Sequence, residues 1–327
     1  MAGRGSRLRP HTLTIPKPLI PIAGKSIVQR LVEDIVNVCG KKVDEIAFVI
    51  GDFGKEVEEK LKNIAEGLGA KGSIYYQKDP LGTAHAVLCA KDSLIGNCVV
   101  AFADTLFKAD FTLDATKDGI IWVSKIDDPS SFGVVKLDQR NNITDFVEKP
   151  ETFVSDLAII GIYYFNDGNY LRSELQYLID NNIKEKGEFQ LTNALENMKN
   201  KGVKFSPGKV DEWLDCGNKD AAIYTNERVL ENTCSNISKC ATIHNSEVIE
   251  PCFIGNNAII KNSKIGPHVS IGNNTKIENS TISKTIIQNN TIVINAKLKS
   301  SMLGNEVFFD GKNIEQEVSI GDFSETK

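Results

Sequence analysis

The feature that most restricts the fold of this chain is a series of aliphatic residues in its last third. Beyond residue 235 an isoleucine or leucine recurs mostly every five or six positions, with asparagine and glycine frequent between them. A β-helix needs this spacing, because each of the three short strands in a coil sends one aliphatic side chain into a narrow core. The series predicts a β-helix of about four coils. Its members are Ile237, Ile243, Ile249, Ile254, Ile260, Ile265, Ile271 and Ile277, continued less regularly by Ile282, Ile287, Ile292, Leu298 and Leu303.

The chain before this series alternates between helical and strand patterns. Strands that alternate with helices predict a parallel, doubly wound, Rossmann-like α/β sheet. Ligands of such sheets bind beyond the carboxyl ends of the strands, where Gln77 and Asp104 are expected. The expected helices are 26–39, 55–66 and 83–90, and the expected strands are 45–50, 73–77 and 98–103.

The length of 327 residues allows one large domain and a smaller one. We expect an α/β domain over residues 1–232, the β-helix over residues 233–312 and a polar tail over residues 313–327 that caps the β-helix or frays.

Charge and composition narrow the class of partner. The net charge of −5 and the isoelectric point near 5.6 disfavour binding to nucleic acid or to an anionic membrane. No apolar run approaches the length of a membrane span, and the seven cysteines contain no Cys-x-x-Cys pair. We therefore expect a cytoplasmic protein that acts on small phosphorylated substrates.

A loop suited to phosphate lies at the N-terminus. Gly3 and Gly5 allow the backbone to approach a polyphosphate, and Ser6 follows them. Arg7 can bind phosphate oxygens with its planar guanidinium, and Lys17, within a Pro-Lys-Pro-Leu run, supplies a point charge. These features together favour a phosphate site over a merely flexible terminus.

This segment resembles the N-terminal motif of the sugar-1-phosphate nucleotidylyltransferases, and the resemblance extends along almost the whole chain. It implies catalytic roles for Arg7 and Lys17 and nucleotide binding by Gly3, Gly5 and Ser6. Similar hexapeptide repeats build left-handed parallel β-helices in this family. The family's loop follows a buried strand, whereas Met1 is already inside the loop, so we expect the true start to lie several residues upstream.

The resemblance places two metal-binding carboxylates at Asp104 and Asp215. Asp104 follows an apolar strand, and Asp215 lies in Trp213-Leu214-Asp215-Cys216-Gly217, which matches a Trp-x-Asp-x-Gly motif. Carboxylates together with phosphate oxygens suit Mg²⁺. By position alone, Asp104 is as compatible with a cap on the next turn as with a metal ligand, and Asp215 is an ordinary turn aspartate.

The family's equivalent of residues 77–86 holds the nucleobase. Gln77 can pair with donor and acceptor groups of a pyrimidine, and Gly82 would let the base lie against the backbone. Thr83 is expected as a helix N-cap or a base contact, with His85 in a supporting position.

The sugar phosphate is expected near two further segments. Gly133 would let hydroxyls approach the backbone, Glu148 can accept from two sugar hydroxyls, and Lys149 can neutralise the phosphate. Gly161 lies in a matching strand, where Ile160 replaces a common Thr or Asn. Residues 188–192 match a segment that closes over the sugar.

The resulting prediction is a Mg²⁺-dependent, homo-oligomeric sugar-1-phosphate nucleotidylyltransferase that uses a nucleoside triphosphate, with dTTP and glucose 1-phosphate as the first pair. Guanylyl transfer to mannose 1-phosphate and uridylyl transfer to glucose or N-acetylglucosamine 1-phosphate stay open. So do acetyl transfer by the β-helix with His244 or His268 as base, and a non-catalytic sensor of nucleotide sugars.

Overall fold

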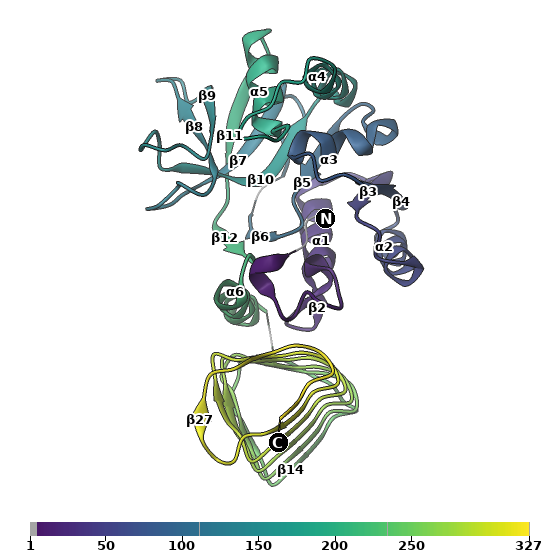
Figure 1. Ribbon diagram of the computed structural model, residues 1–327, viewed down its shortest axis with the longest axis vertical. Coiled ribbons are helices and arrows are strands. Elements are labelled where there is room, and N and C mark those ends of the chain that lie inside the picture. The colour runs from purple at the N-terminus through teal and green to yellow at the C-terminus, as the bar shows by residue number, and fades with distance from the viewer. Residues whose placement is uncertain (1–4, 111, 234, 327) are drawn as a thin grey trace. The chain divides into compact units, whose positions relative to one another are not determined.

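The computed structural model describes residues 5–110, 112–233 and 235–326 (Figure 1). The chain forms two compact units. Of the described residues, 31–213 form the first unit, and 5–30 together with 214–326 form the second. The sequence predicts a boundary at residue 232, whereas the chain passes between the units inside a helix near residue 30 and inside a strand near residue 213.

The early helices and strands of the chain form where their apolar periodicity predicts them. Helix α1 (Ile27–Cys39) starts in the second unit and continues into the first, where β3 (Glu45–Ile50) pairs parallel with β4 (Lys71–Tyr76). Helix α2 (Lys55–Gly67) connects these two strands, and α3 (Thr83–Cys89) follows them. Gln77 therefore lies at the carboxyl end of a strand, as expected.

The main sheet of the first unit has the order β11-β7-β10-β8-β9, and β5 also pairs with β10. Strand β10 runs antiparallel to β5, β7 and β8, while β11 is parallel to β7. The α/β class is confirmed, but the expectation of an all-parallel sheet is wrong. The reason is that β7 to β10 follow one another without crossover helices. The strands are β5 (Cys98–Ala101), β7 (Gly119–Lys125), β8 (Gly133–Leu137), β9 (Ile143–Glu148), β10 (Leu157–Phe165) and β11 (Phe205–Lys209).

Helices α3, α4 (Gly168–Asp180) and α5 (Leu191–Asn200) gather beside this sheet (Figure 1). Their buried side chains share one apolar cluster with the sheet, which includes Ile121, Phe165, Leu171, Leu195 and Phe205. Two further strands, β6 (Thr105–Lys108) and β12 (Glu212–Asp215), pair with each other. Trp213 fixes this pair, since its indole Nε1 donates to Thr105 Oγ1 at 2.5 Å.

The second unit contains the predicted β-helix, which is left-handed and parallel and forms a three-sided coil in Figure 1. Its three sheets contain six, six and five strands. The first contains β13 (Asn236–Ile237), β16 (Cys252–Ile254), β19 (Val269–Ile271), β22 (Ile286–Ile287), β25 (Met302–Leu303) and β28 (Ser319–Ile320). The second contains β14 (Thr242–His244), β17 (Ile259–Lys261), β20 (Lys276–Glu278), β23 (Ile292–Ile294), β26 (Phe308–Asp310) and β29 (Glu325–Thr326). The third contains β15 (Glu247–Val248), β18 (Lys264–Ile265), β21 (Thr281–Ser283), β24 (Lys297–Lys299) and β27 (Glu315–Gln316).

The β-helix continues further than the sequence predicts. Strands β27, β28 and β29 lie in the expected polar tail, so that expectation and the estimate of about four coils are wrong. The apolar positions of this stretch are fewer than in earlier coils, namely Ile314, Val318, Ile320 and Phe323, and Ile314 and Phe323 are 62% and 68% exposed.

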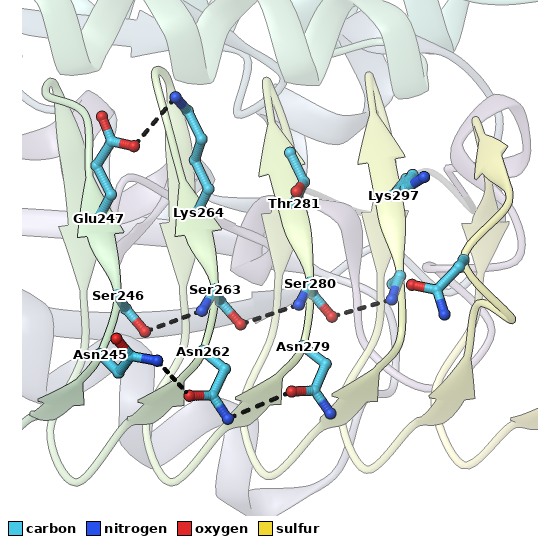
Figure 2. A pocket seen from close by; sticks show the side chains of 12 residues that line it. Asn245, Ser246, Glu247, Asn262, Ser263, Lys264, Asn279, Ser280, Thr281 and Lys297 are labelled. Atoms are coloured by element: carbon cyan, nitrogen blue, oxygen red, sulfur yellow. Dashed lines mark hydrogen bonds and ion pairs between the residues drawn. The ribbon is translucent and has the colours of Figure 1, made fainter.

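Asparagines stabilise one corner of the β-helix. Asn245, Asn262, Asn279 and Asn295 all have positive φ angles, a conformation that asparagine tolerates better than most residues. Their side-chain amides form a ladder, beginning with Asn245 to Asn262 at 2.8 Å. Figure 2 shows this ladder beside a row of serines in a shallow pocket, where the hydroxyl of one coil accepts from a backbone N–H of the next at 3.0 Å.

The second unit also holds the N-terminal loop, the hairpin of β1 (Pro21–Ile22) and β2 (Lys25–Ser26), and α6 (Lys219–Asn232). Asn226 of α6 is fully buried, and its Oδ1 accepts from Ala23 N at 2.9 Å and from Ser270 Oγ at 2.7 Å. This side chain therefore ties the hairpin and α6 to the β-helix. Within the described chain, none of the helices has both the length and the apolar character that a membrane span requires.

Candidate active site

The N-terminal loop has a defined conformation from Gly5 onward. Gly5 is left-handed at φ 57°, and its carbonyl accepts from Thr12 Oγ1 at 2.8 Å. A 3₁₀ turn, η1 (Ser6–Leu8), follows and is anchored by the fully buried Leu8, while Ser6 and Arg7 are exposed. Gly3, also predicted to bind nucleotide, lies outside the described residues.

Lys17 begins a second short turn, η2 (Lys17–Leu19), and is only 7% exposed. A Cβ atom placed on Gly5 would lie 3.0 Å from Lys17 Cβ. The absence of a side chain at Gly5 therefore lets the two segments pack closely. The structure thus brings both predicted cationic residues into one loop region of the second unit.

Arg7 and Asp215 meet although they lie at opposite ends of the α/β region. A Cβ atom on Gly217 would lie 2.7 Å from Asp215 Oδ2 and 3.3 Å from Arg7 Nη2. Both charged groups therefore crowd the same point, and only a glycine leaves room for them. A guanidinium and a carboxylate, each predicted from the sequence to take part in the site, are in this way placed side by side in the second unit.

The predicted base-binding residues form a compact group in the first unit. Gln77 is 9% exposed, and its Nε2 donates to Gly82 O at 3.1 Å and lies 3.1 Å from His85 Nδ1. Since a carbonyl can only accept, the amide nitrogen must face Gly82. Both amide protons are therefore used within the chain, and base pairing through Gln77 would rest on its carbonyl oxygen.

Gly82 also has a structural reason to be glycine. Its φ is 118°, and a Cβ atom there would lie 2.4 Å from Phe189 O and 2.7 Å from Phe189 N. Gly82 itself is the N-cap of α3, so the expectation that Thr83 caps this helix is wrong. Instead, Thr83 Oγ1 donates to Gln190 Oε1 at 3.2 Å and accepts from Leu191 N at 2.9 Å.

The segment 188–192 extends from this group to the predicted sugar site. Gln190 Nε2 donates to Glu188 Oε2 at 3.3 Å, and Thr192 Oγ1 donates to Glu148 Oε2 at 3.3 Å. The start of α5 therefore connects the two predicted sites through side chains. The resemblance to the family implies only a sugar-side role for this segment. Its contact with the base side was not predictable, because Thr83 and Gln190 are distant in the chain.

Glu148 is the central acidic residue of the predicted sugar site. Its side chain is 13% exposed and lies beside Gly133, whose Cβ would be 3.0 Å from Glu148 Oε2. Burial raises the pKa of Glu148, and this is partly opposed by Lys149, whose Nζ is 3.8 Å from Glu148 Oε1, and by the Thr192 hydroxyl. Lys149 has a positive φ of 45° and is half-exposed.

Asp104 lies between β5 and β6, at the carboxyl end of a strand as predicted. Gly161, predicted to bind sugar phosphate, has a φ of 83°, and a Cβ atom there would lie 3.1 Å from the ring of Phe102. Gly161 O also accepts from Phe102 N at 2.9 Å. Gly161 thereby positions the backbone two residues before Asp104. Burial raises the pKa of the neighbouring Tyr163, and the negative charges of Glu148 and Asp104 add to this shift.

Comparison with known proteins assigns the family. Residues 1–232 match the nucleotidyl transferase family. The chain belongs to this family. It is 33% identical over 259 residues to the bifunctional protein GlmU of Methanococcus vannielii, covering 76% of this chain and 59% of that protein. It is 28% identical over 257 residues to the low-salt glycan biosynthesis nucleotidyltransferase Agl11 of Haloferax volcanii, covering 76% and 69%.

The fold of this nucleotidyl transferase is shared with a solved structure of UDP-glucose pyrophosphorylase complexed with UDP-glucose. The TM-score is 0.58 at 24% identity, over 71% of this chain and 97% of the other. The chain spans 59% of the length of the Methanococcus relative.

The carboxylates of this nucleotidyl transferase suit a hard divalent cation. Asp104 and Asp215, the two carboxylates that the sequence predicts to bind metal, both lie in the matched region. Among the described residues, the ligand atoms of Glu227, Glu231 and His268 also lie within 4.8 Å of one another. That group is an ion-pair cluster, because Lys284 Nζ is 3.0 Å from Glu227 Oε1 and the His268 ring nitrogens are 3.4 and 3.2 Å from Glu227 and Glu231.

Sequence reasoning missed the residues that tie the loop to the β-helix. His11 is expected to be a packing or surface residue, and Lys219 receives no role. The structure places His11 against Ser319 and Lys219 against Glu317. Neither pair is marked by a motif, since a lone histidine or lysine gives no signal of a distant partner.

Proposed function

We propose that this nucleotidyl transferase transfers a nucleotidyl group from a nucleoside triphosphate to a sugar 1-phosphate and releases pyrophosphate. The observation that carries the proposal is that one segment of the first unit, residues 188–192, contacts both predicted sites: Gln190 meets Thr83 on the base side and Thr192 meets Glu148 on the sugar side. A single unit thus contains adjoining groups suited to the two substrates of this reaction.

The reaction requires an oxygen of the sugar phosphate to attack the α-phosphorus while pyrophosphate leaves on the opposite side. Catalysis of this step consists mainly of positioning and of stabilising negative charge. In our proposal Arg7 and Lys17 bind the triphosphate oxygens, with Gly3, Gly5 and Ser6 as further nucleotide-binding residues. Asp104 and Asp215 would hold Mg²⁺, which when bound neutralises charge on the phosphates.

The orientation of Gln77 supports a particular class of base. With both amide protons directed to Gly82 and His85, its carbonyl oxygen is the group that can bind a base. An acceptor at this place suits the ring N–H of thymine, uracil and guanine. Among these we propose thymine, the base of the dTTP and glucose 1-phosphate pair that the sequence predicts first.

Glu148 and Lys149 support a sugar 1-phosphate as the second substrate. A buried carboxylate accepts hydrogen bonds from hydroxyls, and a half-exposed lysine can approach a phosphate. In our proposal Gly133 and Gly161 border this site, and glucose 1-phosphate is the first candidate. We also propose a cytoplasmic homo-oligomer, as the sequence predicts.

Pyrophosphate release tests this function. The full chain is incubated with Mg²⁺ and each of dTTP, UTP, GTP, CTP and ATP, paired with the 1-phosphates of glucose, mannose and N-acetylglucosamine. We expect the highest kcat/KM with dTTP and glucose 1-phosphate. A clear preference for UTP or GTP would overturn the thymidylyl assignment, and no turnover with any pair would overturn the proposed function.

A matched pair of loop variants controls this assay. Arg7→Gln should lower kcat/KM by about 100-fold or more, because it removes a charge-assisted contact to the triphosphate. Arg9→Gln removes an exposed arginine of the same loop and should change kcat/KM by less than about twofold. Equal losses in the two variants would contradict the role of Arg7.

A further inference from the structure

The N-terminal loop packs directly on the last coil of the β-helix. Three contacts join residues 10–14 to residues 319–322. His11 Nε2 lies 3.1 Å from Ser319 Oγ, and Thr14 Oγ1 donates to Asp322 Oδ2 at 2.5 Å. A Cβ atom on Gly321 would lie 2.9 Å from Pro10 Cβ, so the coil is in van der Waals contact with the loop.

His11 is enclosed at this junction. Its side chain is fully buried, and burial lowers its pKa to about 4, with Asp322 opposing and Lys219 adding to this shift. The ring is therefore neutral near pH 7. A neutral, buried ring held by one hydroxyl is typical of a packed junction rather than of a loose surface contact.

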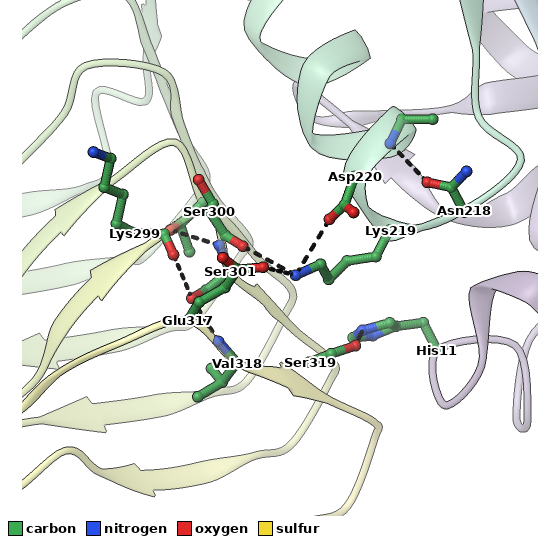
Figure 3. A network of polar contacts seen from close by, with 12 residues as sticks. His11, Asn218, Lys219, Asp220, Lys299, Ser300, Ser301, Glu317, Val318 and Ser319 are labelled. Atoms are coloured by element: carbon green, nitrogen blue, oxygen red, sulfur yellow. Dashed lines mark hydrogen bonds and ion pairs between the residues drawn. The ribbon is translucent and has the colours of Figure 1, made fainter.

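The turn that carries Asp215 rests on the same part of the β-helix. Lys219, four residues after Asp215, forms an ion pair with Glu317, and its Nζ is 3.4 Å from Ser300 O (Figure 3). Figure 3 shows Lys219 and His11 approaching neighbouring positions of the last coils. The two segments that bring Arg7 beside Asp215 are thus supported by a shared surface.

We propose that the terminal coil, defined here as residues 315–326, is a positioning element for nucleotidyl transfer. Through Ser319, Gly321 and Glu317 it holds the loop of Arg7 and the turn of Asp215 in the geometry that the reaction needs. This inference rests on the function proposed above. His11, Ser319 and Lys219 are positioning residues, since they touch the loop and the turn rather than the substrates.

Two variants weaken the junction without touching a proposed catalytic residue. Ser319→Ala removes the hydroxyl that meets His11, and Gly321→Ala inserts a methyl group against Pro10. Each has a matched control. Ser324→Ala changes a serine of the same coil whose backbone carbonyl accepts from Phe308 N at 3.0 Å, and Gly67→Ala adds a methyl group where nothing lies within 4 Å.

A positioning role predicts that the junction variants lower kcat without a matching change in KM. Because the proposed sugar contacts lie in the first unit and not in the loop, we expect Ser319→Ala and Gly321→Ala to lower kcat about tenfold or more while the KM for the sugar 1-phosphate changes less than about threefold. The two controls should retain wild-type kcat, and Ser319→Thr, which keeps the hydroxyl, should recover most of the loss. Unchanged kcat in both junction variants would overturn the inference, as would a loss matched by the controls.

Hydrogen exchange of the loop separates this inference from the proposed function. The amides of His11 and Leu13 are bonded within the loop at 3.1 Å each, so they report its opening without any substrate. We expect about tenfold faster exchange in Ser319→Ala and Gly321→Ala than in their controls. Unchanged exchange would overturn the inference even in an active enzyme. If exchange is faster in the two variants but the wild-type protein turns over no substrate pair, the proposed function is overturned, and the positioning role with it.

Discussion

His11 makes the stability of the second unit depend on pH. Burial lowers its pKa to about 4, below the usual value near 6.5. Between these values the unfolded chain binds a proton that the folded chain does not, so stability is complete above about pH 7 and falls as the pH decreases toward 4. The expected loss from this residue is on the order of 3 kcal/mol.

The variant His11→Gln removes this titration. The difference in free energy of unfolding between wild type and His11→Gln should shrink as the pH is lowered from about 7 to about 4.5 in urea titrations. His244→Gln, in an exposed strand of the same unit, is the matched control for the loss of an imidazole. A pH-independent difference for His11→Gln would show that its ring is protonated equally in both states.

At the level of elements, the approach of α3 to the segment 188–190 depends on Gly82. Gly82→Ala would place a Cβ 2.4 Å from Phe189 O and force a side chain into φ 118°. We expect a loss of about 2–4 kcal/mol in stability and weaker nucleotide binding by the folded protein. Thermal unfolding and nucleotide titration would measure both.

Gly54 provides a matched control for this change. It is the N-cap of α2, with φ 82° and ψ 164°, and a Cβ atom there would meet nothing within 4 Å. Gly54→Ala therefore carries the backbone strain without the clash and should cost about 1–2 kcal/mol. If the two variants lost the same stability, the contact with Phe189 would not be what restricts Gly82.

The sequence predicts elements best where one local period decides them. Helices α1, α2 and α3, strands β3, β4 and β5, and the predicted isoleucines of the β-helix from Ile254 to Ile287 form where their spacing indicates. The expected inward positions of Ile237 and Ile243 are wrong, since both are exposed, and Val293 takes the buried place expected of Ile292. The direction of β10 was not predictable in this way, because it depends on which strands the connections between residues 119 and 165 bring together. The last coil is not predicted by the aliphatic pattern, because among its described residues only Val318 and Ile320 pack against the core of the β-helix.

The sequence likewise predicts only part of the candidate site. Motifs mark Gln77, Asp104, Glu148 and Asp215 as candidates, since each follows or ends a strand in a recognisable segment. The sequence does not show that both amide protons of Gln77 are used within the chain, or that Arg7 meets Asp215 across Gly217. These depend on tertiary contacts between residues that have no local pattern in common.

For the whole molecule, the proposed metal-binding carboxylates are Asp104 and Asp215. We expect Asp104→Asn and Asp215→Asn each to lower kcat by about 100-fold or more and to raise the Mg²⁺ concentration needed for half-maximal rate. Removal of Mg²⁺ by EDTA should abolish turnover by the wild type, with recovery on adding excess Mg²⁺. Pyrophosphate release across a Mg²⁺ titration would measure these effects.

Asp110→Asn is the control, because Asp110 is an exposed carboxylate close to Asp104 in sequence. It should leave both kcat and the Mg²⁺ dependence unchanged. A variant of Asp104 or Asp215 that behaved like this control would remove that residue from the proposed metal site.

The contact between residues 10–14 and residues 319–322 can form only at the end of translation. The loop leaves the ribosome early, whereas the coil that receives it is translated more than three hundred residues later. The first unit can fold in the meantime, since its residues 31–213 are already made. An mRNA that ended before the codon of residue 315 would therefore encode every proposed catalytic side chain, but the N-terminal loop would lack its contacts with the terminal coil.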